Sequence, residues 1–214
     1  MTDLLLIGGA TPEMLERLGA AFTVHRLSDA ADPVSWLAEH GAKIHYVATN
    51  GHDGVKPDYI KALPNLKLIS CYGVGYDAID TNLARAGGIM VTHTPNVLNA
   101  EVASTALMLM LACYRNLLAD DAYVRSGDWE TGGNAPLSRS ADNQVVGIVG
   151  LGRIGQAIAD KLAPFNATIL YHARSQKMVP YQYCESLLDM ARASDVLICI
   201  TPGGEATNKL INAK

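Results

Sequence analysis

The chain has 214 residues, of which 49% are hydrophobic and 18% are charged, and its formal net charge is −4. This composition is typical of a globular protein with one large or two small domains, and the acidic balance argues against nucleic acid as the main partner. The apolar runs Leu4–Ile7 and Ala106–Cys113 are too short for a signal peptide or a membrane span. The four cysteines are scattered without C-x-x-C spacing, so we expect no disulfide framework, no metal site, and reduced core thiols in a cytoplasmic protein.

The first part of the chain alternates between strand-like and helix-like segments. Strands are expected over residues 4–7, 22–27, 44–48, 66–71 and 89–92, and helices over 11–18, 32–39 and 57–63. Thr11 suits the N-cap position and Pro12 the first helical position of the first helix, and Asp32-Pro33 opens the second. Alternation of strands and helices at this length predicts a doubly wound parallel sheet, so we expect a first α/β domain over residues 1–98.

Ligands of such sheets bind outside the carboxyl ends of the strands, where two loops of the first domain are expected. One loop covers Thr49–Gly54 and the other covers Tyr72–Asp77. Glycines at positions 73 and 75 leave backbone N–H groups uncovered, which suits a small carboxylate. A plain glycine turn is the alternative interpretation.

Residues 99–118 read as one helix that is apolar nearly all round, so we expect it to be buried on most sides. Such a helix fits a hinge between domains or the interface of a homodimer. The polar, turn-rich stretch 126–142 is expected to be a surface loop, and Trp129 within it is either a dimer anchor or a small packing contact.

The stretch Val145–Gly155 predicts a strand, a glycine turn and the start of a helix. Gly150 permits the tight turn, Gly152 lets a pyrophosphate approach the backbone, and Gly155 lets the helix pack closely on the strand. The start of the helix offers free N–H groups and a positive dipole end to the phosphates. A glycine pattern of this kind is weak alone, but strands are expected over 145–149, 167–172 and 196–200 and helices over 152–163 and 186–193, as in one half of a dinucleotide-binding domain.

The residues after the second of these strands favour NADP over NAD. NAD-binding domains place an acidic residue about twenty positions after the glycines, but none lies between Asp160 and Glu185. Arg174 offers a bidentate fork for a phosphate, Ser175 a hydroxyl donor, and Lys177 a positive charge. The alternative is a solvated surface run, and NAD(H) is the second choice of cofactor.

The chain resembles the D-isomer-specific 2-hydroxyacid dehydrogenases, particularly their glyoxylate/hydroxypyruvate reductase branch. The resemblance is carried by Cys71–Asp80, Thr94–Ala106 and Val146–Gly155, which together span most of the chain in the order that the family has. It implies two Rossmann/flavodoxin-like α/β domains, of which the second, over residues 99–214 with its linking helix 99–118, is incomplete in this chain.

The resemblance also assigns roles to individual residues. It implies that the first domain binds a 2-oxo acid through the backbone of Val74 and Gly75, with Asn50 near the mouth of the site. It implies that Leu151, Gly152, Arg153 and Ile154 hold the pyrophosphate. Three further residues are implied to lie along the cofactor: Thr105, Thr201 and Pro202.

The family uses an Arg and a His paired with an acidic residue, and all three follow a motif similar to Lys209–Ala213. No catalytic residue can therefore be assigned here, since His93 and His172 are poor substitutes. We expect the sequence to be the N-terminal part of a longer reductase, because half a sheet would leave the strand over 145–149 with an unpaired apolar edge. The alternatives are a catalytically silent NADP-binding regulatory or scaffold protein and, with less support, a methyltransferase.

Overall fold

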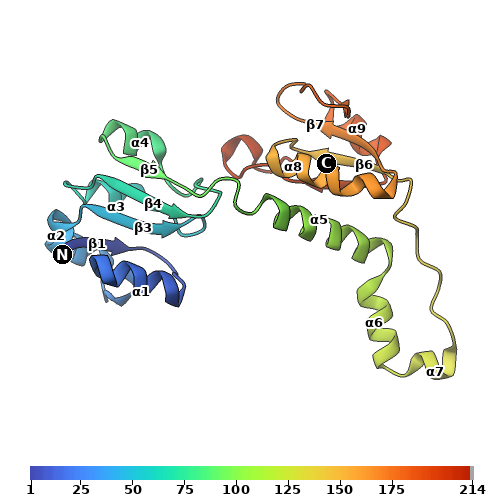
Figure 1. The fold of residues 1–214 in the computed structure, drawn as a ribbon, viewed down its shortest axis with the longest axis horizontal. Coiled ribbons are helices and arrows are strands. Elements are labelled where there is room, and N and C mark those ends of the chain that lie inside the picture. Colours follow the sequence, from blue (N-terminus) through green and yellow to red (C-terminus); the bar gives the residue numbers. More distant parts are fainter. Residues whose placement is uncertain (213–214) are drawn as a thin grey trace. The chain divides into compact units, whose positions relative to one another are not determined.

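The computed structural model describes residues 1–212 and divides into two compact units. The first unit comprises Met1–Val97 together with the segment that starts at Pro202, and the second comprises Leu98–Thr201 (Figure 1). The segment from Pro202 thus groups with the first unit, whereas the sequence pattern assigns it to the domain over residues 99–214.

The first unit is a five-stranded parallel sheet in the order β2-β1-β3-β4-β5. Its strands are β1 (Thr2–Leu6), β2 (Phe22–Arg26), β3 (Tyr46–Asn50), β4 (Leu68–Tyr72) and β5 (Met90–Thr92). Its α-helices are α1 (Pro12–Ala21), α2 (Pro33–His40), α3 (Pro57–Lys61) and α4 (Thr81–Ala86). The chain moves outward from β1 to β2 in one direction and from β3 to β5 in the other, so the winding reverses between β1 and β3.

Alternate residues of the central strands are buried on opposite faces of this sheet. Leu5 and Val47 belong to one core with residues of α2 and α3, while Leu4 and Leu6 belong to a second cluster with residues of α1. Burial on both faces explains why the strands read as nearly continuous apolar runs in the sequence.

The second unit is a four-stranded parallel sheet in the order β8-β7-β6-β9. Its strands are β6 (Val145–Val149), β7 (Thr168–His172), β8 (Gln182–Tyr183) and β9 (Val196–Cys199). Its α-helices are α5 (Asn99–Tyr114), α6 (Leu117–Arg125), α7 (Asp128–Gly132), α8 (Arg153–Leu162) and α9 (Leu187–Ala193). Short 3₁₀ turns complete the two units at Leu27–Asp29, Gly41–Lys43, Ala163–Phe165 and Glu205–Thr207. The fold class expected from the sequence, two parallel α/β units, is confirmed.

The strand β6 is not an edge of the sheet, so the expectation of an unpaired edge there is wrong. It pairs with β7 on one side and with β9 on the other. The edge beyond it is β9, where Leu197 and Cys199 are exposed. The fourth strand of the unit, β9, returns to pair with the first, β6, which the linear order of the segments does not reveal.

The apolar segment 99–118 is two helices rather than one. α5 ends at Tyr114, and Asn116 adopts the left-handed conformation with φ 49° before α6 begins. Asparagine is the residue other than glycine that most readily ends a helix in this way. Only Ala103, Met110 and Tyr114 of α5 are buried, on the side that packs along α8, so the expectation of burial on most sides is wrong for this chain.

Three short elements have no counterpart in the sequence prediction. α4 follows the cap Asp80, whose carboxylate accepts a hydrogen bond from the Leu83 N–H at 2.9 Å. α7 interrupts the expected loop 126–142 and carries Trp129 on its exposed surface. β8 is only two residues long, below the length at which alternation is detectable.

The cysteines differ in burial. Cys71 is buried, but Cys184 is half-buried and Cys113 and Cys199 are exposed, so the expectation of four core thiols is wrong. Among the described residues no single helix has the length and hydropathy to cross a membrane; α5 and Leu117–Ser126 pass that test only as a pair bent by 58°.

Candidate functional site: a glycine turn and two sheet-edge loops

The turn between β6 and α8 is closed by two glycines. Gly150 has φ +98°, and a Cβ there would lie 2.7 Å from the Ile200 carbonyl oxygen. Its N–H donates to the His172 carbonyl at 2.8 Å, which ties the turn to the end of β7. Gly155 is buried in the first turn of α8 against the backbone of Gly150. No side chain could replace hydrogen at either position without moving the backbone.

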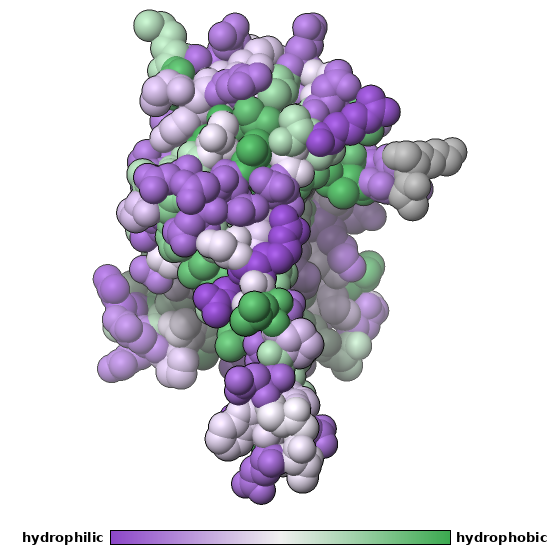
Figure 2. Space-filling view, turned by 90° about the vertical axis from the view of Figure 1, so that its right-hand side faces the viewer, coloured by the Kyte–Doolittle hydropathy of each residue, from purple (hydrophilic) through white to green (hydrophobic). Residues whose placement is uncertain are grey.

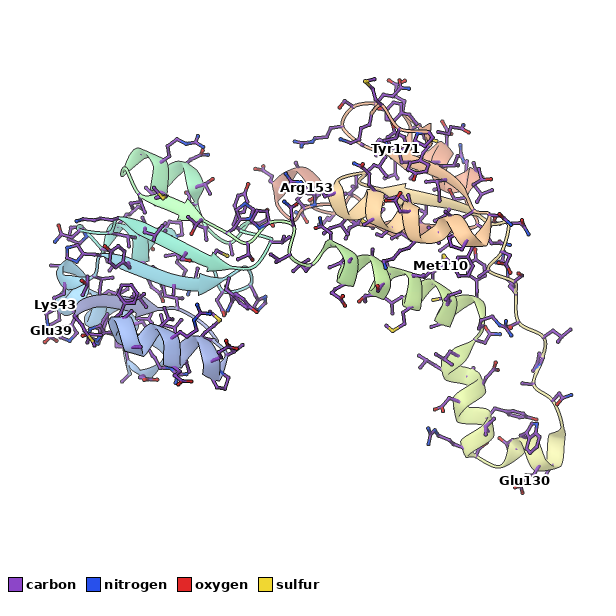
Figure 3. The ribbon with its side chains drawn as sticks, viewed as in Figure 1. Glu39, Lys43, Met110, Glu130, Arg153 and Tyr171 are labelled. Carbon is purple, nitrogen blue, oxygen red and sulfur yellow. The ribbon has the colours of Figure 1, made fainter. Side chains whose placement is uncertain are left out.

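The third glycine of the turn, Gly152, lies in open space, whereas Gly150 and Gly155 pack against backbone. Gly152 is the N-cap of α8, has no side chain to cap the helix, and has no atom within 4 Å of where its Cβ would be. In the described part of the chain, the N–H groups of Leu151, Gly152, Arg153 and Ile154 donate to no protein acceptor. Free N–H groups and an open approach at a helix N-terminus fit a pyrophosphate. Figure 3 shows Arg153 at this end of α8.

The loop between β7 and β8 (residues 173–181) carries the residues expected to select the cofactor. Arg174, Ser175 and Lys177 are all exposed. Within residues 1–212, neither Arg174 nor Lys177 forms an ion pair with an acidic side chain. Two unneutralised cations beside a hydroxyl fit a phosphate dianion, so the residues present suit a phosphorylated dinucleotide.

The other residues expected along the cofactor lie in different surroundings. The Thr105 side chain is exposed on α5 and donates its hydroxyl to the Glu101 carbonyl at 3.0 Å. Thr201 lies beside the glycine turn, since its Cγ2 would be 3.1 Å from a Cβ on Gly150. Pro202 begins the segment that groups with the first unit.

In the first unit, the loop after β4 exposes backbone donors at the expected place. Gly73 donates its N–H to the Thr94 hydroxyl at 3.1 Å, and the Thr94 N–H donates to the Gly73 carbonyl at 2.9 Å. Neither Val74 nor Gly75 donates its own N–H to any other described residue. Two adjacent free N–H groups on an anchored loop suit a carboxylate.

The side chains around this loop fix its shape. The His93 ring bonds to the Val74 carbonyl through Nδ1 at 3.0 Å, and the Cys71 thiol donates to the Gly75 carbonyl at 3.4 Å. Burial raises the pKa of the Cys71 thiol, which keeps it protonated as a donor. His93 therefore supports the loop, while His172 bonds to the Cys184 carbonyl at 3.0 Å at the end of β7.

The Asn50 side chain is occupied within its own loop. Its Oδ1 accepts the N–H groups of His52 and Asp53 at 2.9 and 2.8 Å, and its Nδ2 donates to the Asp53 carboxylate at 2.6 Å and to the Gly9 carbonyl at 3.4 Å. Asn50 thus shapes the loop after β3, where Gly51 packs on the Gly75 carbonyl.

A cavity of about 520 Å³ opens beside Asn50. Its lining comes from the ends of β1, β3 and β4: Gly9, Ala10, Thr11, Asn50, Gly51, His52 and Tyr72. This is the reversal point of the winding, where open parallel sheets bind their ligands. The sequence places Tyr72 in a candidate loop, but it does not identify the residues after β1 as part of a site, because that requires knowing that β1 and β3 are neighbours.

A dinucleotide-binding half-sheet and a second parallel unit with a carboxylate-type loop define a class of protein, the two-unit α/β dehydrogenases. The chain belongs to the D-isomer-specific 2-hydroxyacid dehydrogenase family: residues 107–214 match the model of that family's NAD-binding domain. The resemblance seen in the sequence is thereby confirmed.

Its relatives are reductases of 2-oxo acids. It is 37% identical to the 2-ketogluconate reductase of Gluconobacter oxydans over 98% of this chain and 66% of the relative. It is 40% identical to a glyoxylate/hydroxypyruvate reductase of Arabidopsis thaliana over 82% of this chain and 56% of the relative. The chain also superimposes on a solved structure with a TM-score of 0.89 and 38% identity, over 98% of this chain and 65% of the other. That structure is an NADPH-dependent glyoxylate/hydroxypyruvate reductase from Sinorhizobium meliloti in complex with NADP and malonate. The chain thus spans between half and two thirds of the length of these relatives.

Proposed function

We propose that the protein reduces a small 2-oxo acid of the glyoxylate or hydroxypyruvate type to the D-2-hydroxy acid. The observation that carries this proposal is the pair of free N–H groups at Val74 and Gly75, which offers a site for the substrate carboxylate. The relatives named above support it, since each is named as a reductase. None of them supports the alternative of a catalytically silent NADP-binding scaffold.

The chemistry divides between cofactor and protein. A bound nicotinamide supplies the hydride that reaches the carbonyl carbon, and a proton is added to the carbonyl oxygen. The loop from Gly73 to Asp77 would hold the carboxylate. The two hydrogen bonds between Gly73 and Thr94 hold this loop, and the loop would in turn orient the 2-oxo acid. The cavity beside Asn50 provides room for the part of the substrate beyond its carboxyl and carbonyl groups.

We further propose that the preferred cofactor is NADPH rather than NADH. The glycine turn accepts either dinucleotide, but the exposed Arg174, Ser175 and Lys177 form a set of donors suited to a 2′-phosphate, and the acidic residue that usually receives the ribose hydroxyls is absent from the expected position. The NADP-complexed relative from Sinorhizobium meliloti supports this choice.

The exposed apolar surface of the second unit supports a homodimer. Seven large side chains on α5, α6, α7 and the segment after them are more than half exposed: Met108, Leu109, Leu117, Leu118, Val124, Trp129 and Leu137. Figure 2 shows hydrophobic groups, in green, among the hydrophilic ones on the face that it draws. Large apolar side chains exposed in this number on successive elements fit a subunit interface. The free thiols of all four cysteines support a cytoplasmic location.

The activity is tested on the complete protein with NADPH or NADH and a panel of glyoxylate, hydroxypyruvate and 2-ketogluconate. We expect cofactor oxidation that depends on the 2-oxo acid, and chiral chromatography should identify the D-isomer of the chiral products. Tight NADPH binding without oxidation by any of these substrates would favour the silent binding protein instead.

A further inference from the structure

The buried side chain of Tyr171 reaches the backbone of the β7–β8 loop. Tyr171 lies on β7, is 0% exposed, and is labelled in Figure 3. Its hydroxyl accepts the Lys177 N–H at 2.8 Å and donates to the Lys177 carbonyl at 3.4 Å. A single hydroxyl therefore contacts both polar backbone groups of a residue six positions further along the chain, and it is the acceptor for the Lys177 N–H, while the Lys177 carbonyl also accepts the Val179 N–H at 3.0 Å.

The first residue of the same loop is bonded by a second tyrosine. Tyr183 is the register partner of Tyr171 on β8, and the two ring centroids are 5.4 Å apart. The Tyr183 hydroxyl donates to the Ala173 carbonyl at 3.4 Å. The two tyrosines, whose rings are tilted by 51° to each other, thus anchor the loop at residues 173 and 177, on either side of Arg174 and Ser175.

A third tyrosine connects the far end of the loop to the helix that begins at the glycine turn. The Tyr181 hydroxyl donates to the Asp160 carboxylate of α8 at 3.2 Å. Burial raises the pKa of Tyr181, and the hydrogen bond to Asp160 raises it further, so this hydroxyl keeps its proton. The loop and α8 therefore hold a fixed relation to each other within the second unit.

These contacts matter because the loop has no regular structure of its own between β7 and β8. Exposed Arg and Lys side chains on a mobile backbone would lose conformational entropy when a phosphate binds, and a fixed backbone reduces that loss. The Lys177 backbone lies between Arg174 and the return of the chain to β8, so its position sets where the Lys177 side chain leaves the loop.

We propose that Tyr171 is a positioning residue for cofactor choice: by holding the Lys177 backbone, it sets the loop in the geometry that recognises a 2′-phosphate. Tyr183 supports the same geometry at Ala173. This inference rests on the proposed preference for NADPH, and it assigns that preference partly to a buried residue that touches no phosphate.

The test replaces the hydroxyl and keeps the ring, in Tyr171→Phe and Tyr183→Phe. Adenosine 2′,5′-bisphosphate and adenosine 5′-monophosphate are titrated by calorimetry, and NADPH and NADH by fluorescence. We expect Tyr171→Phe to weaken the two 2′-phosphorylated ligands by about tenfold, the size of the loss of one hydrogen bond that holds the loop, and to change the other two by less than about twofold. Tyr183→Phe should act in the same direction with a smaller effect, because its bond is longer.

Tyr114→Phe is the matched control. Tyr114 is also buried in the second unit, but its hydroxyl donates at 3.4 Å to Gln144, which precedes β6 at the opposite end of the sheet. Tyr114→Phe should leave the ratio of the NADPH affinity to the NADH affinity unchanged. Hydrogen exchange of the Lys177 amide gives a second readout: it should be protected in the wild type and in Tyr114→Phe, and exchange faster in Tyr171→Phe.

The outcomes separate this inference from the proposed function. A wild type that binds both cofactors equally overturns the NADPH proposal, and the positioning role with it. A wild type that prefers NADPH through Arg174, together with a Tyr171→Phe variant that keeps that preference or weakens all four ligands alike, overturns the positioning role alone. If Tyr171→Phe does not fold, two other results decide. The positioning role is overturned when Tyr183→Phe keeps the preference for NADPH and the Lys177 amide of the wild type exchanges without protection.

Discussion

A Cβ on Gly155 would lie 2.4 Å from the carbonyl oxygen of Gly150, closer than real side chains approach a backbone oxygen. The first turn of α8 is therefore packed against the end of β6 with no space between them. This contact fixes where the free N–H groups at the start of α8 point. We therefore expect stability and cofactor binding to depend on different glycines of one turn.

We expect Gly155→Ala to destabilise the second unit by about 1–3 kcal/mol, because the added methyl must displace backbone rather than a flexible side chain. Thermal and urea unfolding measure the change. Gly152→Ala is the control, since nothing lies within 4 Å of its Cβ position, and it should unfold within about 0.5 kcal/mol of the wild type. Equal stability of the two variants would contradict the close packing.

Gly152→Ala should instead weaken cofactor binding. Its methyl group would occupy the open approach to the free N–H groups of Leu151 to Ile154, where the pyrophosphate is expected. Loss of one charge-assisted hydrogen bond corresponds to about tenfold or more in affinity. Because NADPH and NADH share the pyrophosphate, fluorescence titration should show the same loss for both. Unchanged binding of both cofactors would place the pyrophosphate elsewhere.

The pair Asp3 and His25 predicts a pH dependence of the first unit. The hydrogen bond from His25 Nε2 to Asp3 Oδ1, at 2.6 Å, is the largest cause that lowers the pKa of Asp3 below its ordinary value of 3.8. A lowered carboxyl pKa stabilises the fold above pH 3.8, and that contribution is lost as the pH falls through the lowered value. Asp3→Asn should therefore lower the melting temperature at pH 5 to 6, with a difference that shrinks in more acidic buffer.

Asp58→Asn serves as the comparison for this pH series. Asp58 forms an exposed ion pair with Lys61 at 3.5 Å, a kind of contact that adds little to stability. Its melting temperature should follow that of the wild type across the pH range. If Asp3→Asn does the same, the contact between Asp3 and His25 does not stabilise the first unit.

The proposed homodimer predicts that a charge on α5 separates the subunits. Leu109 is 56% exposed, so Leu109→Glu should leave the folded subunit intact, while it places a charge in an interface expected to bury roughly 800 Å² per subunit. Light scattering should show a dimer for the wild type and a monomer for the variant. Leu188→Glu, on α9 and 57% exposed, should remain a dimer. A wild-type monomer at micromolar concentration would refute the proposal.

The sequence predicts the parts of the fold that depend on neighbours along the chain. Asp32 and Pro33 mark the start of α2, and the spacing of Gly150, Gly152 and Gly155 marks the turn into α8, because capping and tight turns are local. The break at Asn116 is local too, but a run of good helix formers on both sides conceals it. Contacts across the sheet are different, since their residues are brought together only by the strand order.

Two features of the site illustrate that limit. The cavity beside Asn50 requires β1 and β3 to be adjacent, and alternation of strands and helices does not fix which strands are neighbours. The hydroxyl of Tyr171 meets Lys177 only because the loop folds back over the end of β7. Arg174, by contrast, is a candidate that its distance to the glycine turn already indicates, because that spacing is nearly constant in dinucleotide-binding units.

The choice of cofactor gives the sharpest prediction about Arg174 itself. A charge-assisted hydrogen bond contributes about 1.5–3 kcal/mol, so Arg174→Ala should weaken NADPH binding by roughly tenfold to a hundredfold. NADH lacks the 2′-phosphate, and its affinity should barely change. Arg192→Ala is a suitable control, because Arg192 is an exposed cation of the same unit that already pairs with Asp189 at 3.4 Å.

An acidic residue at position 173 should change the cofactor preference more than the loss of Arg174 does. Ala173→Asp would repel the 2′-phosphate and offer the ribose hydroxyls an acceptor, so it should weaken NADPH and strengthen NADH. Calorimetric titration of the wild type, Arg174→Ala and Ala173→Asp with both cofactors decides between the interpretations. If the wild type prefers NADH, or if Arg174→Ala weakens both cofactors equally, Arg174 is a solvated surface charge and the protein is not an NADPH-preferring reductase.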